Sequence, residues 1–258
     1  MFFNERLRSV NKSKRILEVG PGGTPHESST EFLDIDPSTF KNDREALLQR
    51  GSAPALKTDK PITYYDGNKF PFKNKSFDYI ISSHVLEHVE DVELFVSELM
   101  RVGNSGYIEY PTILYDYLYN IPVHLNFLHF VEHENTIYYL KKSDTHLSEF
   151  QTIHDFLLKT LDKGHSTLVD SFKDTMFEGF EWDSSKPIKV KKAVSIEQIM
   201  PTFEKVTIFE TPVNNIVETQ LVHINGVDST SSKKLFFVLV RRVGSKLRRA
   251  LKRRSTTE

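Results

Sequence analysis

The chain of 258 residues contains no cysteine. This absence excludes a disulfide scaffold and any metal site built from thiolates, and it fits a reducing compartment. Long apolar runs are also missing, since none reaches the roughly 18 residues that span a bilayer. Residues 1–15 lack the apolar core of a secretion signal. We therefore predict a cytoplasmic protein, or one that is at most peripheral to a membrane.

Acidic residues are scarce in one stretch near the C-terminus. Residues 241–254 hold 8 of the 34 lysines and arginines and no acid. Residues 1–240 therefore carry 26 basic and 34 acidic side chains, a formal charge of −8. This asymmetry predicts a single domain over residues 1–240 and a basic tail over residues 241–258.

The tail repeats apolar residues at helical spacing, namely Val240, Val243, Leu247 and Leu251. Such a basic amphipathic helix suits peripheral contact between residues 241–254 and an anionic membrane. Contact with nucleic acid is an alternative, less favoured because the rest of the chain is acidic. A solvated basic end is the third interpretation. The sequence leaves the oligomeric state open.

Short apolar runs alternate with helical patterns along the first half of the chain. We predict strands at residues 15–19, 31–35, 62–65, 77–82 and 106–110, and helices at 38–50 and 91–102. Strands separated by helices are typical of βαβ units in a parallel sheet. Two further strands, at 204–210 and 234–241, would close the sheet as an antiparallel pair. The predicted fold class is α/β, with a Rossmann-like, mostly parallel seven-stranded sheet flanked by helices.

Residues 112–200 break this pattern. They are rich in aromatic residues and histidine, and their apolar periodicity is weak. We interpret them as an insertion between strands five and six, with helices around residues 113–119 and 149–162.

A glycine-rich segment, Glu18-Val19-Gly20-Pro21-Gly22-Gly23-Thr24-Pro25, follows the first strand directly. Glycines at such a place let the backbone approach a ligand closely, and open α/β sheets bind ligands at strand ends. A simple tight turn would have the same composition. The segment alone therefore indicates a ligand loop only weakly.

A second candidate follows at Leu33-Asp34-Ile35-Asp36, where the second predicted strand ends. An acid at this place can accept hydrogen bonds from both ribose hydroxyls of a nucleoside. Asp36-Pro37-Ser38 also reads as a helix start, so a capping role is the alternative. We favour Asp34 as the ribose ligand because it is nearest the strand end.

Two longer motifs come next, Tyr65-Asp66-Gly67-Asn68-Lys69-Phe70-Pro71-Phe72 and the run from Ser76 to Asp91, which contains Ser-Phe-Asp-Tyr-Ile and Leu-Glu-His. With the two earlier motifs they resemble the class I S-adenosylmethionine (SAM)-dependent methyltransferase superfamily, in its broad methyltransferase-domain group. The resemblance covers roughly residues 14–111. Four motifs in the right order are far more specific than any one of them.

The resemblance implies a role for each motif in binding SAM. Glu18, Gly20, Pro21 and Gly22 would lie at the methionine end, and Asp34 and Ile35 at the ribose. Asp66 and Gly67 would lie beside the adenine, with Asp66 accepting from its amino group. Ser82, Ser83 and His84 would border the site of methyl transfer.

The chain departs from the family pattern in two places. Asp34 follows Glu18 by only 16 positions, fewer than is usual, so the helix after the glycine-rich loop must be short or irregular, as Pro25 also suggests. The turn before the fifth strand is shortened to Val102-Gly103-Asn104-Ser105-Gly106, and we attach no loss of function to it.

Histidines are the candidate general bases, because their pKa lies near neutrality. His84 lies at a strand end, and His124, His129 and His133 lie in the insertion; we predict that His84, His124 and His129 are catalytic. Any one of them could instead be structural. His84 and His88 have a spacing that can bind metal, but the sequence shows no third ligand, and we predict no metal site.

The Gly-Pro-Gly loop, the Glu109-Tyr110-Pro111 turn and the histidine-rich insertion resemble methyltransferases of surface-glycan assembly. We therefore expect O-methylation of a sugar hydroxyl in glycan biosynthesis, with a glycan or another small molecule as acceptor. Methylation of another metabolite, a lipid or RNA is an alternative. A non-catalytic SAM-fold binding protein is another, which the acids at 18, 34 and 66 disfavour.

Overall fold

A computed structural model describes residues 1–36, 56–160, 169 and 171–200. These residues belong to one compact unit, Met1–Pro201, and a second unit comprises Thr202–Glu258. The predicted helix at 38–50, the predicted strands at 204–210 and 234–241, and the tail at 241–254 lie outside the described residues. None of the helices within the described ranges is long and apolar enough to cross a membrane.

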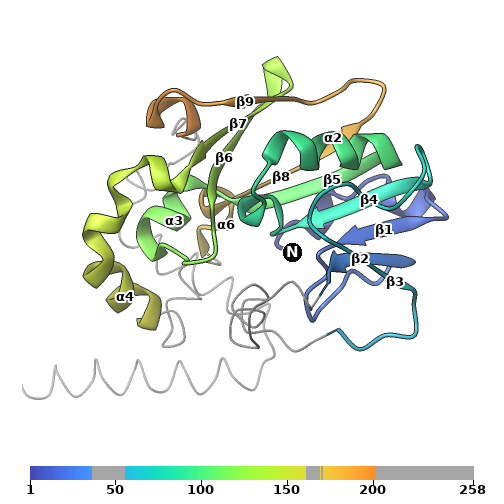
Figure 1. The fold of residues 1–258 in the computed structure, drawn as a ribbon, viewed down its shortest axis with the longest axis horizontal. Helices are drawn as coiled ribbons and strands as arrows, with labels where there is room; N and C mark the ends of the chain where they lie inside the picture. The colour runs from blue at the N-terminus through green and yellow to red at the C-terminus, as the bar shows by residue number, and fades with distance from the viewer. Residues whose placement is uncertain (37–55, 161–168, 170, 201–258) are drawn as a thin grey trace, which may run out of the picture. The chain divides into compact units, whose positions relative to one another are not determined.

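The main sheet has six strands in the order β3-β2-β1-β4-β5-β8 (Figure 1). They are β1 (Ile16–Val19), β2 (Glu31–Ile35), β3 (Ile62–Tyr65), β4 (Phe77–Ser83), β5 (Gly103–Pro111) and β8 (Phe177–Asp183). The first five are parallel and β8 is antiparallel to β5. The strand order reverses between β1 and β4, which is where open α/β sheets form ligand crevices. The predicted Rossmann-like α/β fold is confirmed.

The strand that follows β5 in the sheet comes from inside the predicted insertion, so the prediction that residues 112–200 lie between strands five and six is wrong. We expected the sixth strand beyond residue 200, but β8 begins at Phe177. The strand sequence (Phe-Glu-Gly-Phe-Glu-Trp-Asp) contains three acids and a glycine, which disfavour its prediction as a strand. Glu178 and Glu181 are partnered, accepting hydrogen bonds from Tyr110 Oη and Tyr79 Oη.

A second sheet went unpredicted, with strands in the order β6-β7-β9. They are β6 (Asn126–Val131), β7 (Thr136–Lys141) and β9 (Lys189–Lys192). β6 and β7 form a hairpin whose turn contains Asn135 in a left-handed conformation, with φ +52°. Leu128 and Ile137 are fully buried and join the same apolar core as β1 and β4.

The helices in this region are α3 (Ile113–Tyr119), α4 (Gln151–Thr160) and α6 (Lys173–Met176). The first confirms the prediction at 113–119, and the second agrees with the core of the prediction at 149–162. Short 3-10 turns occupy Asn4–Arg6, Val10–Lys12, Leu86–His88, Glu132–Glu134, Lys142–Asp144, His146–Phe150 and Ile196–Ile199.

Helix α2 (Val92–Val102) packs an apolar face onto the sheet through Phe95, Val96 and Leu99. Asp91 caps it, since its carboxylate accepts a hydrogen bond from Leu94 N at 2.8 Å. Both features confirm the sequence prediction. The predicted turn at Val102–Gly106 is wrong, because β5 begins at Gly103 directly after the helix. Gly103 permits this junction, since a Cβ there would lie 2.6 Å from Ile80 Cδ1.

Replacing the cap residue Asp91 by alanine is expected to destabilise the fold by about 1 kcal/mol, because it removes the acceptor for a helix N–H. Asp91→Asn, which can still accept this bond, should cost less than half as much. Urea denaturation of both variants measures the difference. Equal losses in the two variants would contradict a capping role.

Candidate active site

A cleft of about 1200 Å³ opens where β1 and β4 end. The glycine-rich loop forms one wall, and the residues that follow β4 form another. The segment 121–124 and parts of the first 11 residues also line it, as do Tyr115, Leu158 and Phe177. The cleft thus lies at the switch point of the sheet, where the strand order predicts a ligand site.

The glycine-rich loop bends sharply after β1, with left-handed φ angles of +63° at Gly20 and +56° at Gly22. Gly20 N donates to Leu33 O at 2.8 Å, which ties the loop to β2. A Cβ on Gly20 would lie 2.6 Å from Val85 Cγ2, whereas one on Gly22 would meet nothing within 4 Å. No helix follows within residues 20–30, as the short spacing predicted.

Glu18 is buried at the end of β1 and lines the cleft. Its carboxylate accepts hydrogen bonds from Ser29 Oγ at 2.6 Å and His26 N at 2.8 Å. Burial raises the pKa of Glu18 above its ordinary value. Glu18 therefore holds the far side of the loop in place and also presents a polar group to the cleft.

The predicted nucleoside residues lie at the same edge of the sheet, at the ends of β2 and β3. Ile35 is in register with Tyr65, so Asp34 and Asp66 end neighbouring strands. Asp66 accepts hydrogen bonds from the backbone and side chain of Asn68, and Gly67 takes a φ of +89°. Asp34, Ile35, Asp66 and Gly67 are not among the described residues that line the cleft.

The two serines at the end of β4 face different surroundings. Ser83 lines the cleft and donates to Glu109 Oε1 at 2.9 Å. Ser82 is buried within the strand, and its hydroxyl has no hydrogen-bond partner among the described residues.

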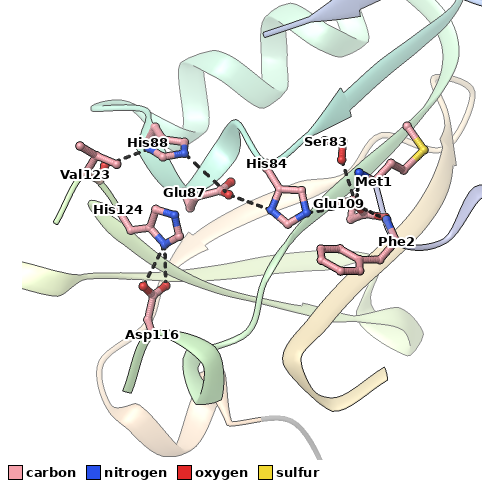
Figure 2. A network of polar contacts seen from close by, with 10 residues as sticks. All are labelled: Met1, Phe2, Ser83, His84, Glu87, His88, Glu109, Asp116, Val123 and His124. Atoms are coloured by element: carbon pink, nitrogen blue, oxygen red, sulfur yellow. Dashed lines mark hydrogen bonds and ion pairs between the residues drawn. The ribbon is translucent and has the colours of Figure 1, made fainter. Parts of the chain in front are cut away.

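His84 follows β4 in a left-handed conformation, with φ +57°, and its ring lies between two buried glutamates (Figure 2). Nδ1 is 3.3 Å from Glu87 Oε1, and Nε2 is 3.2 Å from Glu109 Oε1. Burial by itself would lower the pKa of His84, but the two carboxylates outweigh it and raise the pKa to about 9. His84 is therefore a cation at neutral pH, suited to holding negative groups rather than accepting a proton.

Glu109 lies in β5, so the predicted Glu109-Tyr110-Pro111 turn is wrong. Its carboxylate accepts hydrogen bonds from Phe2 N at 2.9 Å, Phe3 N at 3.2 Å and Tyr107 Oη at 2.7 Å. Burial alone would raise the pKa of Glu109, but His84 and these donors lower it to about 2. The carboxylate thereby joins the N-terminal residues to β5.

On the other side of His84, a second cluster combines Glu87, His88, His124 and Asp116 (Figure 2). His88 Nδ1 is 3.0 Å from Val123 O, and His124 Nδ1 is 2.8 Å from Asp116 Oδ1. Burial alone would raise the pKa of Glu87, but the neighbouring histidines lower it. Burial lowers the pKa of His88.

The remaining predicted histidines lie elsewhere. His129, on β6, contacts Glu178 at 2.6 Å and is not among the described residues that line the cleft. The His133 side chain is 83% exposed. Of the three histidines predicted to be catalytic, the structure brings His84 and His124 to the cleft and leaves His129 away from it.

Sequence reasoning missed several residues that shape the site. The only sequence signal for Glu87 is its place in the Leu-Glu-His motif, and Asp116 belongs to no motif. Phe2 lines the cleft, stacks on Phe177 with ring centroids 3.9 Å apart and meets the His84 ring edge-on. The pair Phe2–Phe3 was a visible apolar signal near the start of the chain, but nothing in it indicated the site.

The strand order and the cleft together give a ligand crevice at the switch point of a Rossmann-like sheet. Residues 26–108 match the family described as "Methyltransferase domain". The match begins after the glycine-rich loop and ends in β5. Residues 26–108 of this chain are therefore similar to a methyltransferase domain.

Two curated relatives are plant enzymes of Rauvolfia serpentina. Ajmaline N-methyltransferase is 28% identical over 105 residues, which are 37% of this chain and 34% of the relative. Norajmaline N-methyltransferase is 26% identical over 114 residues, which are 40% of this chain and 39% of the relative. The chain thus spans little more than a third of the length of these relatives.

Solved structures of similar shape include the YcgJ protein of Bacillus subtilis, at 16% identity and a TM-score of 0.30. That match covers 45% of this chain and 58% of the other. A SAM-dependent methyltransferase from Mesorhizobium loti is 22% identical, with a TM-score of 0.27, and the match covers 39% and 48%.

Proposed function

We propose that this chain is a SAM-dependent methyltransferase that methylates a hydroxyl group of a sugar in glycan biosynthesis. The observation that carries the hydroxyl acceptor is the buried His124–Asp116 pair, of which His124 lines the cleft. A hydroxyl must lose its proton when it is methylated, and this pair is built to receive one.

The backbone of the glycine-rich loop suits the binding of SAM at the cofactor end of the cleft. Gly20 and Gly22 carry no side chains, and an added Cβ at Gly22 would meet nothing within 4 Å. Such a loop can hold the methionine end of SAM through backbone groups, while Asp34 takes the ribose. SAM supplies an electrophilic methyl group on a sulfonium cation, and the buried carboxylate of Glu18 favours positive charge nearby.

The acceptor end combines a base with aromatic rings. Asp116 fixes His124 through Nδ1, so Nε2 is the nitrogen that can take a proton. The methyl–oxygen bond forms as the methyl–sulfur bond breaks, and the hydroxyl proton passes to Nε2. Phe2, Tyr115 and Phe177 line the same cleft, and aromatic faces of this kind can pack against the apolar face of a sugar ring.

An amine acceptor is the second candidate, because both plant relatives are named N-methyltransferases. A neutral amine attacks without first losing a proton, so it has less need of an oriented base. The dependence of activity on His124 therefore separates the two acceptor classes.

Methyl transfer from isotopically labelled SAM to sugar glycosides, nucleotide sugars and amines tests the proposal. We expect products from hydroxyl acceptors, and a kcat in His124→Asn lower by about 100-fold or more. SAM binding measured by calorimetry should be lost in Asp34→Ala and kept in His124→Asn. A folded chain that binds no SAM, or that methylates only amines, would overturn the proposal.

A further inference from the structure

Glu87, His88 and His124 all line the cleft and lie close to one another (Figure 2). One potential ligand atom from each lies within 4.8 Å of the others. The rings of His88 and His124 meet edge to face, with centroids 4.8 Å apart. Two imidazoles and one carboxylate with this convergence form a known type of ligand set for divalent transition metals.

Both histidines are oriented as metal ligands are. A metal-bound histidine usually donates its second ring N–H to a carboxylate or a backbone carbonyl, which fixes the ring. His88 does this through Nδ1 to Val123 O at 3.0 Å, and His124 through Nδ1 to Asp116 at 2.8 Å. The remaining nitrogen of each ring, Nε2, is therefore the one with a lone pair to offer. His88 Nε2 lies 3.9 Å from Glu87 Oε1.

Glu87 supplies an independent observation. Its side chain is fully buried, and neither carboxylate oxygen has a hydrogen-bond partner among the described residues. A buried carboxylate without hydrogen bonds is costly, so such groups are generally paired with charge or bound to metal. His84 contacts Oε1 at 3.3 Å and balances part of the charge. The side of Glu87 that faces His88 and His124 has two imidazoles and no donor of good geometry.

From these contacts we infer that Glu87, His88 and His124 bind a divalent transition-metal ion at the acceptor end of the cleft. Three protein ligands leave at least one coordination position open, and all three residues line the cleft. The ligand atoms need to close by roughly 1 Å to reach the bond lengths of zinc, which are about 2.0–2.2 Å. The sequence prediction of no metal site considered only His84 and His88, because the third ligand lies 36 residues further along the chain.

The role of the ion rests on the proposed function, whereas its binding does not. An open position lets the ion coordinate the acceptor hydroxyl and lower its pKa. With the ion bound, His124 is a ligand and the hydroxyl proton passes to water in the cleft; in the metal-free chain, His124 takes the proton as proposed above. His124→Asn removes both routes, so the loss of kcat expected above holds in either state.

The test uses the full chain, stripped of metal with a chelator and titrated with Zn²⁺ or Mn²⁺. We expect one ion per chain by mass spectrometry of bound metal. Binding should be at least about 100-fold weaker in Glu87→Gln and His124→Gln. Asp116→Asn keeps all three ligands but loses the group that orients His124, so it should weaken binding by about 10-fold to 100-fold. If either ligand variant fails to fold, Asp116→Asn still tests the metal site.

His129→Gln is the matched control. His129 pairs with Glu178 much as His124 pairs with Asp116, but it lies outside the cleft, and its variant should bind as the wild type does. A folded wild type that binds no ion, or equal binding in all variants, would overturn the site. Metal binding without methyl transfer to any acceptor would support the site while refuting the proposed function.

Discussion

Replacing Glu109 by glutamine is expected to cost about 3–5 kcal/mol of folding stability, the largest loss that we expect from a single charge change. The carboxylate is fully buried, and its partners include Phe2 N, Phe3 N, Ser83 Oγ, Tyr107 Oη and the His84 ring. A glutamine of the same shape turns one acceptor into a donor. It also leaves the charge of His84 with one buried carboxylate instead of two.

The folding stabilities of the wild type and of Glu109→Gln should also respond differently to acid. Glu109 has a pKa of about 2 in the fold, compared with an ordinary value of 4.5. Its ionisation therefore stabilises the fold fully above pH 4.5, and the benefit is lost as the pH falls toward 2. The difference in unfolding free energy between wild type and Glu109→Gln should be constant between about pH 4.5 and 6.5 and shrink over this acidic window. It should also shrink as the pH rises from 6.5 toward about 9, because His84 then loses the proton that Glu109 stabilises.

Urea denaturation at several pH values measures this effect, and Glu90→Gln is its control. Glu90 makes the same kind of charge pair, with Lys141 at 3.7 Å, but its side chain is 89% exposed. An exposed pair contributes little, so this control should change stability by less than about 1 kcal/mol. A loss in Glu109→Gln no larger than in the control would show that Glu109 is not what binds the N-terminal residues to β5.

The parts of the fold that the sequence predicted are those with local signals. The strands β1 and β4 are short and mostly apolar, and α2 has a cap residue and a regular apolar face. The glycine-rich loop and the acids at the ends of β2 and β3 could be placed because parallel strands end at one edge of the sheet.

The parts that could not be predicted depend on contacts between distant segments. The sequence of β8 is too polar to indicate a strand. Only the fold shows that Glu178 and Glu181 have partners on other strands. β6 and β7 are buried on both faces in places, so their sequences show no clean alternation. Glu109 finds its partners about 106 residues away, at Phe2 and Phe3.

The same reason explains why the histidine cluster went unrecognised. His88 and His124 are far apart in sequence, and they meet because the segment after α3 returns to the end of β4. Leu125 N donates to Glu87 O at 2.7 Å, and Asn126 donates to Val89 O at 2.7 Å. These backbone contacts fix the segment, and no spacing rule in the sequence encodes them.

Alanine at Gly22 is expected to weaken SAM binding by at least about 10-fold while leaving the fold largely intact. A left-handed φ costs an alanine about 1–2 kcal/mol, and nothing lies within 4 Å of the added Cβ to raise that cost. The methyl group instead projects from the loop that lines the cleft, where the backbone must approach the cofactor closely. Calorimetry with SAM and thermal denaturation together measure the two effects.

Alanine at Gly20 should do the reverse, because its Cβ would lie 2.6 Å from Val85 Cγ2. We expect a loss of about 2–4 kcal/mol from strain and overpacking together. The double variant Gly20→Ala with Val85→Ala should lose less than the sum of the single variants, because it removes the clash. If Gly22→Ala bound SAM as tightly as the wild type, the loop would not contact the cofactor, and the methionine end of SAM would have to lie elsewhere along the cleft.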